Sequence, residues 1–299
     1  MRAVVLREVG GDLAVEEVLE PDGEHVVAVR AAGVNFADVL IRRGHYPQMP
    51  ELPHVLGNEV AGELDGRRVI AFPRGAGGYA ERVAVDPDWV LPLPEHASYA
   101  AGAAFLTTYL TAHIPLIHQL RITGTSVVLV HAGSGGVGTA AIQLAKNLGA
   151  TVIATASTDE KRAFARSVGA DEAIGYDELE GLRVDAVIDP VGGEVFTRSL
   201  ALLNPLGAIV AIGYTGGAWE DPSVQWLVGR NATVAGFYLG RLLRLRPDVV
   251  RAAADELLGL WAERKIEPVV GSRFPLESAQ EAHELIESRR HVGKVVLEP

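Results

Sequence analysis

The pattern of apolar and polar positions is most regular in the middle of the chain. The β-branched run at 127–130 is long enough for a strand buried on both faces. A second apolar run follows at 151–156. Between them, apolar residues recur at i, i+3, i+4, i+7, i+8 and i+11, the spacing of a helix that buries one face: Val137, Ala140, Ala141, Leu144, Ala145 and Leu148. The stretch therefore predicts a complete βαβ unit.

Strand and helix patterns continue to alternate after this unit. Strands are predicted at 173–174, 184–188, 208–212 and 233–237, and helices at 159–168 and 195–203. Such alternation predicts an α/β fold with a parallel, doubly wound sheet. Ligands of these sheets bind at the carboxyl ends of the strands. We therefore expect the loops at 131–138, 189–193 and 213–217 to line one crevice.

The two ends of the chain have a different pattern. Residues 1–105 contain short apolar runs separated by glycine turns, which predicts a β-rich domain. A short helix is expected at 36–43, with Asn35 as its N-cap, and an apolar helix at 97–120 marks the crossing between domains. The tail has two helices and two strands, too little to form its own core. The predicted domains are a Rossmann domain at 107–238 and a second domain formed by 1–106 and 239–299.

The composition and net charge argue against several classes of partner and site. The chain has 299 residues, a net charge of −11 and no cysteine. The negative charge argues against nucleic acid or an anionic membrane as the main partner. Without cysteine there is no disulfide or Cys-ligated zinc. No stretch resembles a signal peptide or has about 20 consecutive apolar residues, so we expect a soluble cytoplasmic protein.

The turn between the first strand and helix of the βαβ unit matches the G-x-G-x-x-G pattern. Its residues are Gly133, Ser134, Gly135, Gly136, Val137 and Gly138. In this pattern the first glycine permits a tight turn, the second lets backbone N–H groups approach a pyrophosphate, and the third lets the helix pack against its strand. A structural glycine turn is the alternative, but the flanking strands and helix favour dinucleotide binding.

The end of the next strand indicates which dinucleotide binds. An NAD site usually places an acidic residue there to bind the ribose 2′-hydroxyl. This chain has Thr155-Ala156-Ser157-Thr158, with Lys161 in the following turn. A hydroxyl and a lysine suit a 2′-phosphate, which a carboxylate would repel. The sequence therefore favours NADP, although Lys161 could also be a solvated surface residue.

Several segments together resemble the quinone oxidoreductases, the zeta-crystallin-like branch of the medium-chain dehydrogenase/reductase superfamily. They are Ala32–Asp38, Arg43–Pro47, the glycine loop, Gly169–Asp171 and Gly293–Val296. The resemblance covers nearly the whole chain. It implies a GroES-like catalytic domain built from both chain ends, NADPH as cofactor, and reduction of quinones or α,β-unsaturated carbonyls. It also implies a homodimer joined through the Rossmann edge strand at 233–238.

Zinc-dependent relatives have Cys where this chain has Asn35, and Gly-His-Glu where it has Gly57-Asn58-Glu59. A catalytic zinc needs about three Cys, His or carboxylate ligands. With both positions replaced by amides, we expect metal-free chemistry, which depends on positioning and on hydrogen-bond donors near the developing negative charge.

The resemblance also suggests roles for particular residues. Asn35 and Tyr46 are the expected catalytic side chains, although Asn35 has an equally plain role as a helix N-cap and Tyr46 could be a loop aromatic. One departure affects the substrate entrance, because the segment 63–83 is short by the standards of the family. The expected cofactor-binding residues outside the glycine loop are Thr107, Ser157, Lys161, Tyr176, Gly213, Phe237 and Lys294.

The leading hypothesis is an NADPH-dependent, zinc-free quinone reductase. A 2-alkenal or enone reductase is the alternative within the same fold. An NADPH-binding protein with little turnover, acting as a structural or sensor module, is the alternative from a different class. A methyltransferase is less favoured, because the other matching segments would then be coincidence.

Overall fold

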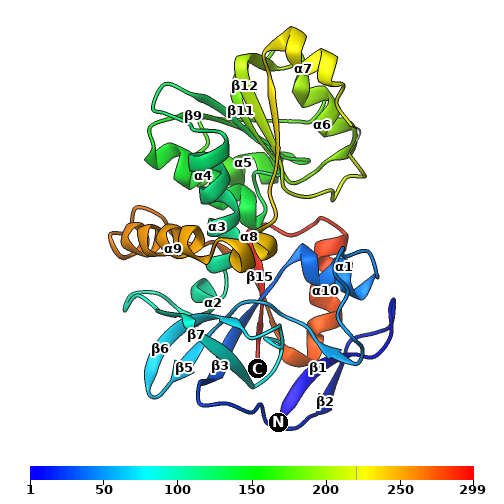
Figure 1. Ribbon diagram of the computed structural model, residues 1–299, viewed down its shortest axis with the longest axis vertical. Helices are drawn as coiled ribbons and strands as arrows, with labels where there is room; N and C mark the ends of the chain where they lie inside the picture. Colours follow the sequence, from blue (N-terminus) through cyan, green and yellow to red (C-terminus); the bar gives the residue numbers. More distant parts are fainter. Residues whose placement is uncertain (220) are drawn as a thin grey trace. The chain divides into compact units, whose positions relative to one another are not determined.

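The computed structural model describes residues 1–219 and 221–299 (Figure 1). The chain folds into two compact units. One consists of Met1–Leu106 together with Pro268–Pro299, and the other of Thr107–Glu267. The two chain ends therefore share a unit, whereas the glycine loop lies in the other.

The second unit contains a six-stranded sheet in the order β10-β9-β8-β11-β12-β13, and every neighbouring pair is parallel. In chain order this is 3-2-1-4-5-6, the order typical of dinucleotide-binding domains. The predicted doubly wound sheet is confirmed. Its strands are β8 (Val127–Val130), β9 (Thr151–Thr155), β10 (Glu172–Ile174), β11 (Val184–Asp189), β12 (Leu203–Ala211) and β13 (Thr233–Gly236).

The helical elements of this unit precede the first strand of the sheet, connect its strands or follow the last of them. Helix α4 contacts β8 and β9, α5 contacts β9 and β10, and α6 contacts β12. Apolar side chains between sheet and helices form the core, including Leu129, Phe196 and Ile209. The helical elements are α3 (Leu106–Ile114), the π-helical turn η1 (Pro115–Gln119), α4 (Gly136–Asn147), α5 (Asp159–Ser167), α6 (Gly193–Leu200), α7 (Val224–Arg230), α8 (Leu239–Leu245) and α9 (Pro247–Ala262).

The first unit is β-rich, as predicted. It has a six-stranded sheet, β14-β15-β3-β5-β6-β7, and a three-stranded sheet, β2-β1-β4. Strand β15 from the C-terminal end pairs antiparallel with β3, so the two chain ends are joined by backbone hydrogen bonds. Its strands are β1 (Arg2–Leu6), β2 (Ala14–Glu17), β3 (Val26–Val34), β4 (His54–Val55), β5 (Val60–Leu64), β6 (Arg67–Pro73), β7 (Arg82–Pro92), β14 (Val270–Pro275) and β15 (Lys294–Glu298).

Four short helical elements complete this unit. The predicted helix after Asn35 is α1, with Asn35 at its N-cap position, and it contacts α10. The apolar faces of both helices join the core of the strands, through Val39 of α1 and Ala282 and Ile286 of α10. The elements are α1 (Phe36–Arg42), α2 (Tyr99–Gly102), η2 (Leu276–Ser278) and α10 (Ala279–Glu287).

Residues 239–267 are predicted from the sequence to lie in the β-rich domain. In the structure this segment, which contains α8 and α9, belongs to the unit with the glycine loop. Glu267 explains the difference. Its backbone N–H donates to Gln143 Oε1 at 2.7 Å, and its carbonyl accepts from Gln143 Nε2 at 3.0 Å, which ties the end of this segment to α4. The chain therefore returns to the first unit at Pro268, two helices later than the sequence indicated.

The helix predicted at 97–120 is divided into α2, α3 and η1. Pro115 has no N–H to continue an α-helical ladder, and the Leu120 N–H instead donates to the Pro115 carbonyl across five residues, in a π-helical turn. The segment Tyr99–Gln119 is long and apolar enough to cross a membrane, but 89% of its most apolar part is buried inside the protein. It therefore serves as core.

Candidate active site

The glycine loop connects β8 to α4 at the carboxyl end of the sheet. A Cβ atom at Gly138 would lie 2.2 Å from the Ala132 carbonyl oxygen, so only glycine allows this approach of helix and strand. A Cβ atom at Gly133 would lie 2.7 Å from Ala154 Cβ on β9. Gly133 therefore serves close packing, and the left-handed backbone that begins the turn belongs to Ala132, with φ of 50°.

The expected 2′-phosphate residues follow β9 and β10. Ser157 is exposed and Lys161 is partly buried, which lowers the pKa of its ammonium. Thr158 is the N-cap of α5, and its hydroxyl accepts from the Lys161 N–H at 3.2 Å. The Tyr176 hydroxyl accepts from the Ala132 N–H at 3.2 Å, so the structure brings this tyrosine to the start of the glycine loop.

The loops after β11 and β12 lie together at the same end of the sheet. Gly192 forms a β-bridge with Gly217, and the Gly216 N–H donates to the Val191 carbonyl at 2.6 Å. The buried Asp189 carboxylate shapes the first loop by accepting from the N–H groups of Val191 and Gly192, at 2.8 and 3.0 Å. Burial nevertheless raises the pKa of Asp189 to about 6.

The remaining expected cofactor residues of this unit border these loops or begin the domain. A Cβ atom at Gly213 would lie 2.9 Å from the Pro190 carbonyl oxygen, so Gly213 packs directly on the β11 loop. Phe237 is half-buried just after β13, and its N–H donates to the Ala211 carbonyl at 3.0 Å. Thr107 is half-buried in the first turn of α3.

His131 is a buried polar residue that the sequence analysis missed. Its Nε2 lies 2.7 Å from Ser199 Oγ and its Nδ1 lies 2.9 Å from Thr155 Oγ1. Because Ser199 donates its proton to the Val195 carbonyl, Ser199 accepts from Nε2–H and Thr155 donates to Nδ1. Burial lowers the pKa of His131 to about 3, so the ring is neutral. It links the ends of β8 and β9 to α6.

In the first unit, Asn35 belongs to a buried polar network with Glu59 and Lys294. The ammonium of Lys294 lies 2.5 Å from Asn35 Oδ1 and 2.5 Å from Glu59 Oε1. Only 4% of Lys294 and 1% of Glu59 is exposed, so this is an ion pair removed from water. Asn35 Nδ2 donates to Glu59 Oε1 and to Asn58 Oδ1, both at 2.9 Å. The network depends on Gly33, where a Cβ atom would lie 2.6 Å from Glu59 Oε1.

A second set of buried hydrogen bonds begins at the N-terminus of α1. The Asp38 carboxylate accepts from the Asn35 N–H at 2.8 Å and from the Tyr79 hydroxyl at 3.0 Å. Burial raises the pKa of Asp38 to about 6. Burial, together with the neighbouring Asp38, raises the pKa of Tyr79 well above its usual value. His283 Nε2 lies 3.3 Å from the Tyr79 hydroxyl, and burial, aided by Arg42 and Arg43, lowers the pKa of His283 to about 3.

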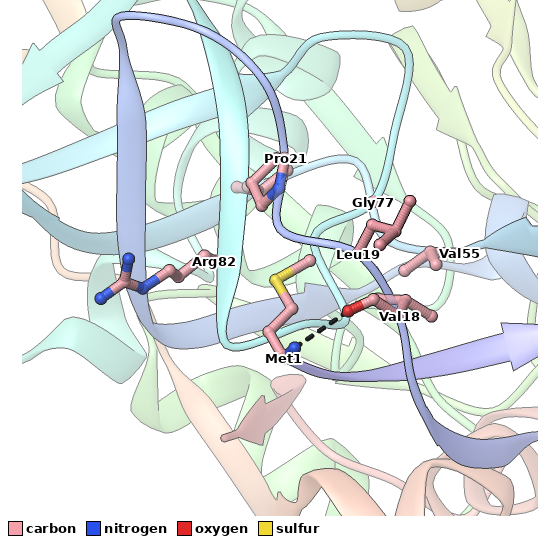
Figure 2. Close-up of a pocket in the computed structure, with 8 residues that line it drawn as sticks. Met1, Val18, Leu19, Pro21, Val55, Gly77 and Arg82 are labelled. Carbon is pink, nitrogen blue, oxygen red and sulfur yellow. Dashed lines mark hydrogen bonds between the residues drawn. The ribbon is translucent and has the colours of Figure 1, made fainter.

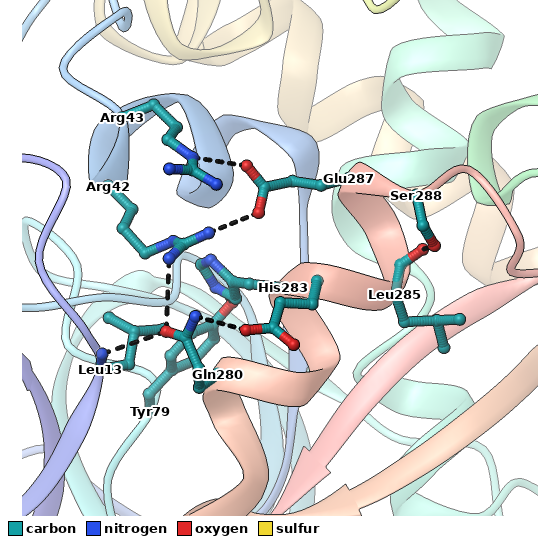
Figure 3. Close-up of polar contacts among 10 residues, drawn as sticks. Leu13, Arg42, Arg43, Tyr79, Gln280, His283, Leu285, Glu287 and Ser288 are labelled. Atoms are coloured by element: carbon teal, nitrogen blue, oxygen red, sulfur yellow. Dashed lines mark hydrogen bonds and ion pairs between the residues drawn. The ribbon is translucent and has the colours of Figure 1, made fainter.

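Helix α1, which begins after Asn35, is fixed to α10 by a set of polar contacts (Figure 3). Arg42 and Arg43 both pair with the Glu287 carboxylate, at 2.5 and 2.6 Å. Gln280 accepts from the Leu13 N–H and from Arg42, which adds the segment before β2. These contacts therefore fix the C-terminal end of α1 to α10.

Tyr46, the other expected catalytic residue, is half-buried in the loop after α1. A pocket of about 370 Å³ lies elsewhere in this unit, and its lining includes Met1, Leu19 and Pro21 (Figure 2). None of the expected site residues lines it, and the Met1 ammonium beside it donates to the Val18 carbonyl at 2.9 Å. We do not assign this pocket to the active site.

A Rossmann sheet with a glycine cradle and a β-rich domain with a buried polar network together define a dinucleotide-dependent oxidoreductase. Residues 21–76 match the model of the alcohol dehydrogenase GroES-like domain, and residues 168–297 match that of zinc-binding dehydrogenase. Human quinone oxidoreductase is 30% identical over 99% of this chain and 97% of its own.

Two crystal structures of quinone oxidoreductases that bind NADPH are similar over the whole of both chains. That of Thermus thermophilus is 38% identical with a TM-score of 0.89, and that of Escherichia coli is 31% identical with a TM-score of 0.90. The chain therefore belongs to the quinone oxidoreductase, zeta-crystallin-like branch of the medium-chain dehydrogenase/reductase superfamily. It is an oxidoreductase that binds NADPH.

Proposed function

We propose that this enzyme reduces quinones with NADPH and without zinc. The observation that carries the proposal is the Lys294 ammonium, which lies 2.5 Å from oxygens of both Asn35 and Glu59. A cationic group already occupies the space between these side chains, and a metal there would be repelled by it. Within residues 1–219 and 221–299, no group of three His, Cys, Asp or Glu side chains could hold a metal ion. The donor set therefore does not fit a catalytic zinc.

The NADPH site fits the second unit. The cradle at Gly133–Gly138 would receive the pyrophosphate, because the N-terminus of α4 begins there and its backbone N–H groups attract an anion. Ser157, Lys161 and Tyr176 would hold the 2′-phosphate, and Thr107, Gly213 and Phe237 would border the nicotinamide. Lys294, expected to approach the cofactor, directs its ammonium to Asn35 and Glu59. We assign to it the role of holding Asn35. Bound NADPH supplies a hydride, that is two electrons and one proton.

The acceptor quinone receives this hydride from NADPH and takes one proton from solvent, giving NADP⁺ and the hydroquinone. An α,β-unsaturated carbonyl would accept a hydride and a proton in the same balance. We expect the acceptor to bind near Asn35 and Tyr46, because carbonyl reduction requires hydrogen-bond donors near the oxygen that gains charge.

We also propose that the protein is cytoplasmic and forms a homodimer joined through β13. Apolar side chains are exposed on β12, which pairs with β13, and on α7, which precedes β13 in the chain: Leu206 at 85%, Val224 at 74% and Val228 at 73%. Exposed apolar groups at the edge of a sheet favour covering by a second copy. Sedimentation velocity tests this, because the variant Val224→Asp should be monomeric at concentrations where the parent protein is dimeric.

Turnover on an acceptor panel tests the function. Purified protein is supplied with NADPH and either naphthoquinones or 2-alkenals, and NADPH oxidation is followed together with product. Higher kcat/KM on the quinones supports the proposal, and higher kcat/KM on the 2-alkenals replaces it with enone reduction. Tight NADPH binding without turnover on either class identifies a binding module instead.

A further inference from the structure

The direction of each hydrogen bond in the Asn35 network is fixed by its two charged members. A lysine ammonium has only donors, and a glutamate carboxylate has only acceptors. Asn35 must therefore turn its oxygen to Lys294 and its nitrogen to Glu59. The second hydrogen of Asn35 Nδ2 is donated to Asn58, which must accept it with its side-chain oxygen. The ammonium thus sets the orientation of two amides in succession.

This direction leaves Asn35 without a donor for the acceptor molecule. Both hydrogens of its Nδ2 are used within the protein, on Glu59 and Asn58, and its oxygen is used by Lys294. Asn35 is also only 9% exposed. The geometry therefore favours a positioning role for Asn35 over the direct catalytic role expected from the sequence.

Asn58, unlike Asn35, has side-chain donors that none of the described residues uses. It is half-buried, and in the part of the chain that the structure describes, the hydrogen bond of its side chain is the one that its oxygen accepts from Asn35. Its Nδ2 group, with two donors, remains for a molecule outside the protein. A buried cation at the far end of an amide chain polarises each bond in turn, which strengthens the last donor.

The backbone that carries Asn58 is also held firmly. The preceding Gly57 has φ of 93°, and a Cβ atom there would lie 2.4 Å from the Tyr79 ring. The Gly57 carbonyl accepts from the Gly78 N–H at 2.9 Å, and the Leu56 carbonyl accepts from the Tyr79 N–H at 2.9 Å. A donor fixed before the reaction stabilises developing charge without reorganisation.

We propose that Asn58 is a catalytic residue, whose Nδ2 donates to the acceptor's carbonyl oxygen as that oxygen gains negative charge. Asn35 and Lys294 are the positioning residues that point the Asn58 amide outward. The proposal rests on the proposed quinone or enone reduction, in which the acceptor gains a hydride from NADPH and a proton from solvent.

The variant Asn58→Asp tests this, because aspartate keeps the shape and still accepts from Asn35 but has no donor. We expect kcat to fall by roughly 10²–10³-fold, the effect of losing one donor to a developing oxyanion. The Kd of NADPH, measured by its fluorescence, should stay unchanged, and circular dichroism should report an intact fold. Asn231→Asp, the same change at an exposed position after α7, is the matched control and should keep full kcat.

The variant Asn58→Gln adds a second arm, since it retains the donors at a longer reach and should recover part of the lost kcat. If the parent enzyme reduces quinones or enones and Asn58→Asp keeps kcat within about threefold, Asn58 is not the donor. If the parent enzyme turns over none of these acceptors, the proposed function fails, and this assignment fails with it.

Discussion

Removing the Lys294 ammonium should destabilise the first domain far more than removing a cation from its surface. In Lys294→Met the Glu59 carboxylate, 1% exposed, would stay buried without its cation. Removing one partner of a buried ion pair costs about 3–5 kcal/mol, because an uncompensated charge is left in a poorly solvated site. Domains are stable by only about 5–15 kcal/mol. The single change should therefore remove a large share of the stability of this unit.

Hydrogen exchange of peptides from β3 and β15 measures this, because it reports the opening free energy of the first domain separately. The matched control is Arg273→Met, on strand β14 of the same domain. Arg273 pairs with Glu298 on the surface, with side-chain exposures of 55% and 42%, and such pairs contribute about 0–1 kcal/mol.

The double variant Lys294→Met with Glu59→Gln completes the experiment. It removes the stranded charge, so we expect it to regain more than half of the loss, and the coupling between the two sites should be on the order of 1–3 kcal/mol. If Lys294→Met opens within about 1 kcal/mol of the parent protein, the buried pair does not have the role assigned to it.

Three further changes have defined outcomes. Burial lowers the pKa of His131 from 6.5 to about 3. Below pH 6.5 the unfolded chain therefore binds a proton at this ring and the folded chain does not, so the free energy of unfolding decreases as the pH falls. His131→Gln should remove roughly 1.4 kcal/mol per pH unit of that dependence between pH 6.5 and pH 5 in urea unfolding, and an unchanged slope would show a solvated ring. Gly138→Ala should weaken NADPH binding in calorimetry and cost about 1–3 kcal/mol, since its Cβ would lie 2.2 Å from the Ala132 oxygen. Lys161→Glu should raise the KM for NADPH more than that for NADH, and equal increases would remove Lys161 from the phosphate site.

The fold was largely predictable because its signals are local. The apolar run of β8, the helical spacing of α4 and the glycines between them are consecutive in sequence. The start of α1 after Asn35 was equally local. The late return of the chain at Pro268 was not, since it depends on Gln143 meeting Glu267 from 124 residues away.

The buried network was beyond local pattern for the same reason. Lys294 and Glu59 are separated by 235 residues, and they meet because β15 pairs with β3 in a register that sets Val295 opposite Val34. The sequence did contain one signal, a glutamate next to the apolar run of β5. Only the structure shows that this glutamate, Glu59, forms a buried ion pair with Lys294.

The most direct test of the central claim is quinone turnover by protein stripped of metal. The enzyme is dialysed against a strong zinc chelator, its metal content is measured by mass spectrometry, and NADPH oxidation with a naphthoquinone is followed without oxygen. The account predicts an undiminished kcat with far less than one zinc per chain and one hydroquinone formed for each NADPH. Loss of turnover on chelation, with recovery on adding Zn²⁺, would contradict it.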